Sequence, residues 1–437
     1  MFRIKSVAMF LFCLCFSAFV LNSGRNCAAF ELTPEGEKLY KQWVEVIGYS
    51  AIDLVKKMDP APEIKPGMEI TPQNAKDYPG LKKLMPESMY RRLDPKHFLP
   101  MEKITIVETR PRYYPQEVIN GTRECLKNVK LNKNTLQIEG YIYGLPFPRV
   151  SDPLHVIWNH VIANLGFEEN VWFDPFSIAN YTDGKVDSLV QGTLGRYRVM
   201  GRLYTDIGPN RESAFFKGQG IMEQGTLLIT YPADLKGTAF LRTRYWDVDK
   251  DDRFVSYLPG LKRIRVLSGT DAQDPIAGSE ITWDEWAVEW QKQPSKKIFP
   301  NEYKILGTQV MLLPVYPSKA ALPIQGQQFT TIWEKRPVWV LEIKSLDSAY
   351  SCSKRIMYAD MEHFKAAYQE YYDRRGALWR TWVDFRYMLP DGQATWEGSD
   401  VLNHITKRQT VLKMNASPNP PLKPEQFDMR WLIKMAR

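Results

Sequence analysis

The sequence is poor in the residues and motifs on which most enzymes depend. Its 437 residues contain five histidines and five cysteines, which are few for metal chemistry. His155 and His160 lie on one predicted helix, but a spacing of five residues places them ~140° apart around its axis, so they do not share a metal easily. The sequence also lacks the nucleophile-elbow serine motif, the phosphate-binding glycine-lysine loop, the dinucleotide-binding glycine motif and the zinc-protease histidine motif. We therefore expect no enzymatic activity, no metal and no cofactor.

Long hydrophobic runs are also scarce, and the longest stands at the start of the chain. Arg3 and Lys5 precede an apolar stretch over 7–21, and Cys27-Ala28-Ala29 supplies small residues for cleavage. The stretch is shorter than the about 20 residues that a membrane-spanning helix needs. This arrangement is typical of a secretory signal peptide over 1–29, cleaved near Ala29. The mature protein is therefore predicted to be exported without a membrane-spanning helix.

Cleavage leaves a chain with little net charge and two cysteines. It removes three basic residues and no acidic one, so the net charge falls from +8 to +5. That charge permits weak attraction to an anionic membrane, but nucleic-acid binding would need a clustered basic patch. The remaining Cys125 and Cys352 either form one disulfide or stay as two buried thiols, and the sequence leaves both alternatives open.

Periodicity divides the mature chain into a helical part and a longer β-rich part. Residues 30–100 are predicted to be mainly helical and begin at Thr33 with an amphipathic helix whose apolar face continues to Val55. Residues 101–417 are predicted to form one β-rich domain. It begins with a strand over 103–108 and helices over 115–128 and 153–165, and from Glu169 onward the pattern alternates with period two between turn sequences, as antiparallel strands do. Residues 418–437 are a Pro-rich tail that we expect to pack on this domain. The predicted fold class is α+β, with one large, curled antiparallel sheet partly covered by helices.

Three short motifs follow one another along the β-rich part. The first joins Leu145-Pro146-Phe147-Pro148 to Trp158-Asn159-His160. The second runs from Tyr257 to Arg265 and is followed by Trp283-Asp284-Glu285. The third comprises Ser353-Lys354-Arg355, Tyr358-Ala359-Asp360 and the stretch from Tyr372 to Trp379. In order and spacing they resemble an uncharacterised family of exported Gram-negative proteins, domain of unknown function 1329, over about residues 68–437.

The resemblance implies a fold similar to that of the outer-membrane lipoprotein carriers LolA and LolB. In this LolA-like fold a curved antiparallel half-barrel has helices covering its concave face, and members of those carrier families take up acyl chains between sheet and helices. The family often accompanies large inner-membrane exporters. The resemblance therefore implies a periplasmic location. The implied partners are a lipid or other hydrophobic small molecule, an inner-membrane exporter and the outer membrane. It implies no catalytic residue.

Alternation along the strands suggests which side chains would line such a cavity. In the run 238–246, Leu241 and Tyr245 are predicted to point inward, whereas Arg242 and Arg244 are predicted to lie on a solvated outer face. A curled sheet that its own side chains do not fill leaves an apolar cavity. An ordinary filled core is the alternative for each of these residues. The complete predicted lining set is Leu227, Ile229, Leu241, Tyr245, Tyr257, Ile264, Val266, Val338 and Val340.

Two arginines of the second motif have a different expected role. Arg263 and Arg265 alternate with Ile264 and Val266, which predicts that the arginines lie on a solvent-facing side of a strand. They are either ordinary sheet surface or a docking site for an anionic lipid or a partner protein.

Together these features predict a monomeric, periplasmic, non-enzymatic carrier or chaperone for a lipid or other hydrophobic molecule, with no nucleic-acid partner. Two alternatives stay open. One is a hydrolase acting on envelope glycan or lipid, and the other is an envelope-assembly scaffold whose sheet edge pairs with a partner strand. A carrier should contain a deep dry cavity and an enzyme a cleft with converging carboxylates or a histidine. A scaffold should have a filled core and an exposed edge strand.

Overall fold

The computed structural model describes residues 32–164, 170–203, 212–267, 273–286, 294–315, 330–388, 394–418 and 422–436. The predicted signal peptide over 1–29 lies outside these residues and stays a prediction. Among the described residues, no helix combines the length and the apolar composition needed to cross a membrane.

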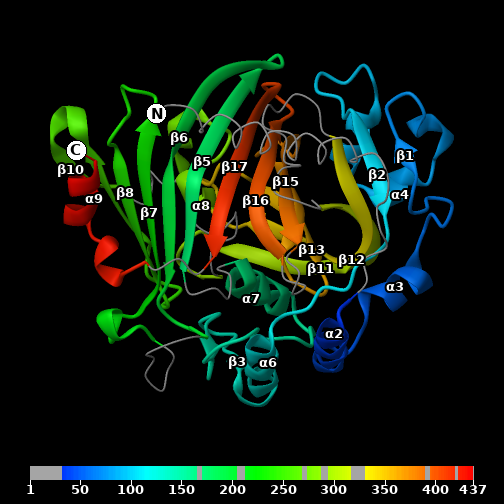
Figure 1. The fold of residues 1–437 in the computed structure, drawn as a ribbon, viewed down its shortest axis with the longest axis horizontal. Coiled ribbons are helices and arrows are strands. Elements are labelled where there is room, and N and C mark those ends of the chain that lie inside the picture. The colour runs from blue at the N-terminus through cyan, green and yellow to red at the C-terminus, as the bar shows by residue number, and fades with distance from the viewer. Residues whose placement is uncertain are drawn as a thin grey trace, which may run out of the picture. The chain divides into compact units, whose positions relative to one another are not determined.

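Fifteen strands join one open, curved sheet (Figure 1). Thirteen of them form an antiparallel series in the order β11-β12-β13-β14-β15-β16-β17-β5-β6-β7-β8-β9-β10. β2 (Lys103–Val107) instead pairs in parallel with β12, and β1 (Glu69–Ile70) pairs with β2, so the sheet is mixed. The α+β class and the large, mainly antiparallel sheet are confirmed, with this one parallel pairing as a difference in detail.

The antiparallel series accounts for most of the β-rich part. Its strands are β5 (Asn170–Thr182), β6 (Lys185–Arg198), β7 (Ile221–Tyr231), β8 (Ala239–Tyr245), β9 (Arg253–Leu258), β10 (Arg263–Leu267), β11 (Asn301–Val315), β12 (Thr330–Ser345), β13 (Lys354–Asp360), β14 (Ala366–Tyr372), β15 (Leu378–Met388), β16 (Ala394–Asn403) and β17 (Arg408–Pro418). β3 (Lys130–Leu131) and β4 (Ile138–Glu139) form a separate pair.

Eight α-helices are described, and most are short. They are α2 (Pro34–Ile47), α3 (Ala51–Met58), α4 (Leu81–Leu84), α5 (Glu87–Tyr90), α6 (Gln116–Asn128), α7 (Pro153–Asn164), α8 (Trp283–Trp286) and α9 (Met429–Met435).

The predicted helix from Thr33 to Val55 is two helices. The Thr33 side chain accepts a hydrogen bond from the Gly36 amide at 3.1 Å and caps α2 as expected. Gly48 then takes a left-handed conformation (φ 91°), which ends α2, and the Ser50 side chain caps α3. The prediction of one continuous helix was wrong. The apolar spacing continues past Gly48, but the helical conformation of the backbone ends there.

The register of the strands defines two faces of the sheet, since residues directly opposite each other on paired strands point to the same side. The side that carries Leu241 and Val383 is covered by α9 at one end and by residues 61–101 at the other. We call it the α9 face. The other side, which carries Arg242 and Arg380, is covered by α8, whose Trp283 ring lies 4.5 Å from that of Phe240. We call it the α8 face.

Candidate functional site

The predicted lining residues do not surround one cavity. Leu241, Tyr245 and Tyr257 pack on the α9 face, in an apolar core that includes Leu432 of α9. Leu227 pairs across the sheet with Phe240 and therefore points to the α8 face instead.

Three further members of the set are buried or partly buried, and they are also distributed over separate parts of the sheet. Ile229, two residues beyond Leu227, is buried. Val338 and Val340 belong to a second apolar core, which the N-terminal residues Leu81 and Met89 complete. The filled-core alternative therefore describes these valines and the three residues under α9 better than a shared cavity does.

The inward orientation predicted for Ile264 and Val266 was wrong. Their side chains are 53% and 62% exposed. Both lie on the α9 face, opposite Tyr257 and Val255, but α9 packs on β8 and β9. β10 is the edge strand of the sheet. Alternation therefore assigned the correct face, but within the described ranges no helix or loop buries these two side chains.

The solvated position predicted for Arg242 and Arg244 was wrong in the opposite sense. Both side chains are almost completely buried on the α8 face. Arg242 pairs with Glu223, and the Arg244 Nη2 atom lies 2.6 Å from Asp252 Oδ2. Burial and the neighbouring Arg244 lower the pKa of Arg242 well below its usual value.

A second buried charge network joins the other end of the sheet to the N-terminal helices. Arg336 binds Asp360 at 2.8 Å and Glu362 at 2.7 Å. Glu362 also accepts hydrogen bonds from Tyr40 and the Ala51 amide, which fixes α2 and α3 to the sheet. Burial opposes ionisation of Asp360, but Arg336 outweighs it and holds the pKa of this carboxyl well below its usual range. These carboxylates are committed to arginines and have a structural role.

The first sequence motif is held together by contacts between its two halves. The Asn159 side chain accepts from the Phe147 amide at 2.9 Å and donates to the Phe147 carbonyl at 2.6 Å. Trp158 donates to the Leu136 carbonyl, and His160 accepts from the Ala366 amide. His160 is fully buried and hydrogen-bonded in this way, so its side chain helps to hold the fold together.

The other motifs contribute to the sheet and its ion pairs. In the second motif, the stretch from Tyr257 to Arg265 includes the β9–β10 turn, and Glu285 pairs with Arg380 of β15. In the third, Asp360 belongs to the network around Arg336. The motif residues therefore mark the architecture of the fold.

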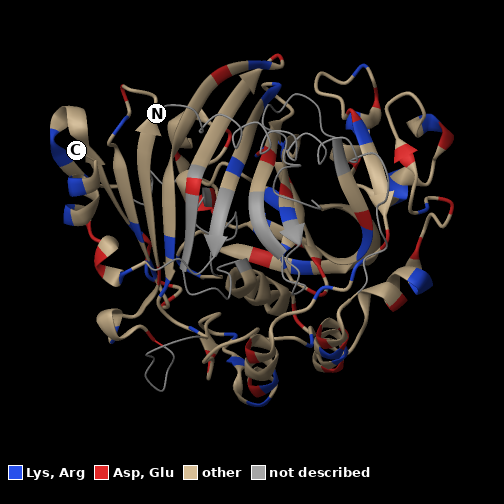
Figure 2. Ribbon diagram, in the orientation of Figure 1, with Lys and Arg blue, Asp and Glu red and all other residues tan. Residues whose placement is uncertain are grey.

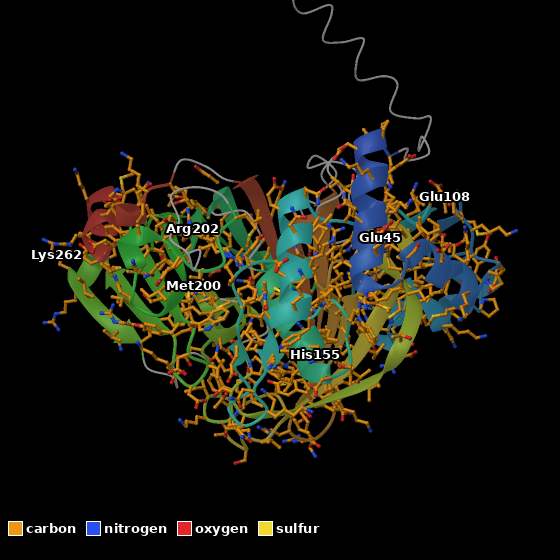
Figure 3. The ribbon with its side chains drawn as sticks, turned by 90° about the horizontal axis from the view of Figure 1, so that it is seen from below. Glu45, Glu108, His155, Met200, Arg202 and Lys262 are labelled. Atoms are coloured by element: carbon orange, nitrogen blue, oxygen red, sulfur yellow. The ribbon has the colours of Figure 1, made fainter. Side chains whose placement is uncertain are left out.

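Arg263 and Arg265 are exposed, as predicted for a solvent-facing side of a strand. Among the described residues, neither side chain pairs with a carboxylate. Figure 2 shows Lys and Arg gathered around β10 and α9, and Figure 3 shows Lys262 at the outer end of this edge.

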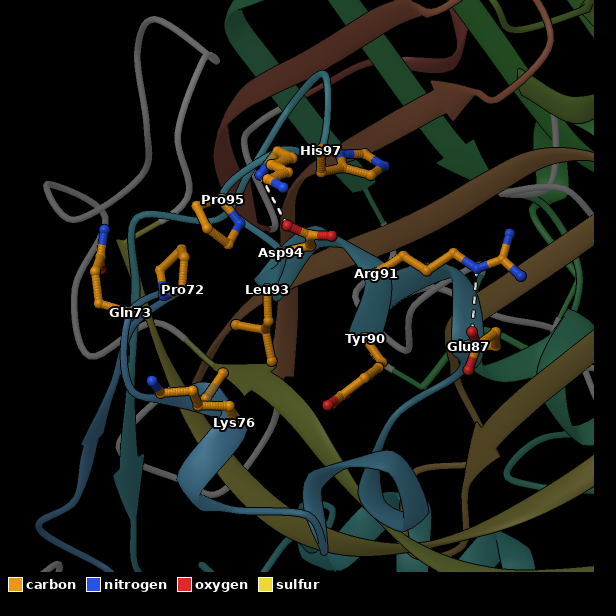
Figure 4. A pocket seen from close by; sticks show the side chains of 12 residues that line it. Pro72, Gln73, Lys76, Glu87, Tyr90, Arg91, Leu93, Asp94, Pro95 and His97 are labelled. Carbon is orange, nitrogen blue, oxygen red and sulfur yellow. Dashed lines mark hydrogen bonds and ion pairs between the residues drawn. The ribbon is translucent and has the colours of Figure 1, made fainter.

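A pocket that the sequence did not predict opens in the N-terminal segment (Figure 4). Its volume of about 650 Å³ lies within the range of small-molecule sites. Ala75 and Leu93 are buried in its floor. The lining residues are Pro72, Gln73, Ala75, Lys76, Glu87, Tyr90, Arg91, Leu93, Asp94, Pro95, Lys96 and His97.

The rim of this pocket, unlike its floor, is charged. Arg91 pairs with Glu87 at 3.1 Å, whereas in the described part of the chain no carboxylate pairs with the ammonium groups of Lys76 and Lys96. The Asp94 carboxylate is occupied by the Lys96 amide, from which it accepts a hydrogen bond at 2.9 Å. The rim therefore offers two exposed cations to a ligand.

His97 completes the rim as a neutral ring near pH 7. Burial lowers its pKa, and its Nδ1 atom accepts a hydrogen bond from the Leu99 amide at 3.0 Å. Little in the sequence indicated this pocket, because its lining comes from short helices and turns between prolines. There, neither helical nor strand periodicity extends far enough to assign faces.

The disulfide alternative for Cys125 and Cys352 was wrong, because both are free, buried thiols. Each donates a hydrogen bond to a backbone carbonyl, Cys125 to Tyr143 and Cys352 to Lys354. Burial raises the pKa of the Cys125 thiol to about 12 and also raises that of Cys352. Neither thiol is suited to nucleophilic chemistry.

The described ranges also lack a cluster of metal-ligating side chains. There, no three His, Cys, Asp or Glu side chains come close enough together to hold a metal ion.

Comparison with known proteins places this fold and its motifs in context. An uncharacterized protein of Pseudomonas aeruginosa is 24% identical over 369 residues, covering 77% of this chain and 73% of its own length. The structure is also similar to a putative outer membrane lipoprotein-sorting protein domain from Vibrio parahaemolyticus (TM-score 0.45, 19% identity, 64% of this chain and 97% of that one). A DUF1329 family protein from Desulfovibrio piger gives a TM-score of 0.46 at 16% identity, covering 64% of this chain and 100% of that one.

A family model, described as protein of unknown function (DUF1329), matches residues 69–429. This match includes all three motifs and most of the sheet, and it confirms the resemblance drawn from the motifs. The chain belongs to the DUF1329 family.

Proposed function

We propose that the protein is a non-enzymatic carrier or chaperone for a lipid or another hydrophobic molecule, and that it acts in the periplasm. The observation that carries this proposal is the pocket in the N-terminal segment, with its buried apolar floor and two exposed lysines at the rim. The ligand that fits this combination is amphipathic, with an apolar body and an acidic head.

The floor accounts for the apolar half of such a ligand. Ala75 and Leu93 belong to the apolar core of this end of the molecule, and Tyr90 packs against the same core. A chain lying on this floor loses contact with water, and each buried methylene contributes ~0.8 kcal/mol.

The rim accounts for the acidic head. Lys76, in the short 3-10 helix Ala75–Asp77, and Lys96, in the turn after Leu93, both line the pocket and are exposed. Charge-assisted hydrogen bonds from ammonium groups to a carboxylate or phosphate are about twice as strong as neutral ones. An inner-membrane exporter as the partner that supplies or receives the ligand stays a prediction.

The direct test is native mass spectrometry of the purified exported protein, followed by lipid extraction and by titration with a fluorescent fatty acid. We expect a bound species of discrete mass that lipid competitors displace. A clean unliganded mass together with no uptake of fatty acid or phospholipid would contradict the proposal.

Pocket variants locate the binding. Lys76→Glu combined with Lys96→Glu should weaken fatty-acid binding about tenfold, and Gln73→Trp, which fills the pocket from its exposed rim, should weaken it for any ligand. Lys56→Glu combined with Lys57→Glu is the matched control, because it makes the same charge change at exposed positions of α3 outside the pocket. Equal binding by the unmodified protein and all three variants would show that the ligand binds outside this pocket.

A further inference from the structure

The edge of the sheet at β10 gathers exposed apolar and basic side chains at one corner of the molecule. Large apolar side chains are normally scattered singly on a protein surface, whereas a contiguous group marks an interaction site. Here five exposed residues lie at the end of β7, in the β9–β10 turn, on β10 and at the end of α9: Tyr231 (50%), Leu261 (63%), Ile264 (53%), Val266 (62%) and Met435 (54%).

The topology explains why these residues meet. β7 ends at Tyr231 and β9 ends at Leu258, and because neighbouring strands are antiparallel, the β7–β8 and β9–β10 turns lie at the same end of the sheet. A Cβ atom built on Gly237 would lie 2.7 Å from the Ala436 carbonyl oxygen and 3.1 Å from Pro259. The end of α9 therefore touches both turns and brings Met435 to them.

The basic residues of the corner come from the β7–β8 turn, the β9–β10 turn, β10 and α9. They are Lys236, Lys262, Arg263, Arg265 and Lys434, and all five are exposed. The two turns, β10 and α9 contain one acidic residue, Asp234. In the described part of the chain, no carboxylate forms an ion pair with any of the five cations. The corner therefore carries a concentrated positive charge that the mild net charge of the whole chain does not reveal.

β10 presents its two kinds of side chain on opposite sides. Ile264 and Val266 lie on the α9 face and Arg263 and Arg265 on the α8 face, and all residues from Gly260 to Val266 are exposed. A surface that meets this strand edge-on contacts both sides at once. A lipid bilayer suits this arrangement, because apolar side chains enter the boundary of the acyl region while the arginines reach back to the phosphates.

From this arrangement we infer that the β10 corner, defined by these ten residues, docks the protein reversibly on an anionic lipid bilayer. The charge complementarity selects the occupant, since basic residues near an anionic leaflet contribute to binding additively and apolar residues alone would not discriminate between lipids. This inference does not rest on the proposed function, because the corner and the pocket share no residue.

The test is co-sedimentation with vesicles of phosphatidylcholine containing about 30% phosphatidylglycerol, compared with vesicles of phosphatidylcholine alone. We expect binding to the anionic vesicles that weakens as salt rises, and little binding to the neutral ones. Arg263→Glu combined with Arg265→Glu should lower the partition coefficient at least about tenfold. Leu261→Ser combined with Ile264→Ser and Val266→Ser should remove the part of the binding that resists salt.

The matched control is again Lys56→Glu with Lys57→Glu, which changes the net charge equally and should bind as the unmodified protein does. Thermal unfolding checks that the corner variants remain folded, as their exposed positions lead us to expect. Binding that is equal for neutral and anionic vesicles, or that survives the arginine reversal, would overturn the inference. Loss of vesicle binding accompanied by capture of a partner strand at β10 would replace it with the scaffold alternative. The fatty-acid titration on the same proteins reports separately on the pocket.

Discussion

Two pairs of arginines stand on the same face of the sheet, two strands apart, and have opposite surroundings. Arg242 and Arg244 on β8 lie almost completely buried and pair with Glu223 and Asp252. Arg263 and Arg265 on β10 share that α8 face but are exposed.

The difference lies in what covers each strand. β8 lies under α8, whose Trp283 packs on Phe240, and its neighbour β7 supplies Glu223 as a partner. β10 lies at the edge of the sheet, and in the part of the chain that the structure describes its side chains from Arg263 to Val266 remain exposed. Strand alternation assigns a side chain to a face, but the layer over that face decides whether an arginine stabilises the interior or remains available to bind something else.

Removing the Glu223 carboxylate, which pairs with the buried Arg242, should give the largest change in the free energy of unfolding. Glu223→Ala leaves Arg242 buried with less compensation, and we expect the free energy of unfolding to fall by about 3–5 kcal/mol. Urea unfolding measures this change. The comparison variant, Arg263→Ser with Arg265→Ser, should change it by less than about 0.5 kcal/mol, as exposed substitutions usually do. Similar losses for both variants would mean that the two pairs do not differ in burial.

The contrast between buried and exposed groups also predicts a response to pH. Burial lowers the pKa of His404 from 6.5 to about 4, so between these values the unfolded chain binds a proton that the folded chain does not. The free energy of unfolding should therefore fall as the pH drops from about 6.5 towards 4, with about 2–3 kcal/mol due to His404.

Unfolding of His404→Gln across this pH range tests the assignment. Gln can keep the hydrogen bond to Thr381 that His404 makes at 2.7 Å and cannot be protonated. Its stability should depend less steeply on pH. An unchanged slope would show that the proton uptake occurs at other residues.

The exposed and buried arginines should also differ in reactivity. Phenylglyoxal needs access to the guanidinium group, so Arg263 and Arg265 should react at least about tenfold faster than Arg242 and Arg244 in the folded protein, the ratio expected if local opening of the buried pair costs more than about 1.4 kcal/mol. Peptide mass spectrometry of a time course gives the four rates. Equal rates would show that the cover over β8 opens as readily as the edge at β10.

The smallest effect is expected from reduction, because the two thiols are already free. Because Cys125 and Cys352 are both free, a reducing agent should leave the unfolding midpoint unchanged. Burial and their raised pKa values should also keep them unreactive towards a disulfide reagent at pH 8 until the chain unfolds. A drop in stability on reduction would instead show that Cys125 and Cys352 form a disulfide.

The sequence predicted the regular parts of this fold well. The helices predicted over 115–128 and 153–165 are observed as α6 and α7, and the period-two pattern after Glu169 predicted the antiparallel strands in general, because these patterns repeat over enough residues to identify the element. The break at Gly48 was missed because apolar spacing resumes on the far side of it. The free thiols were one of two open alternatives, since pairing depends on distances that the sequence does not contain.

The functional surfaces were harder to predict, for a different reason. Ile264 and Arg244 were both assigned from alternation, and both exposures came out reversed because α8 and α9 cover only part of the sheet. The pocket around Leu93 arises from turns and short helices that meet in space. Such sites depend on how elements pack, and a local pattern cannot report that.

The most direct test of the account is transfer of a fluorescent fatty acid from donor to acceptor vesicles that contain phosphatidylglycerol. A carrier that loads in the pocket and docks through the β10 corner should accelerate transfer above the spontaneous rate. The acceleration should be lost in the Lys76→Glu, Lys96→Glu protein and in the Arg263→Glu, Arg265→Glu protein, but not in the Lys56→Glu, Lys57→Glu control. Transfer at the spontaneous rate in the presence of the unmodified protein would contradict the carrier function.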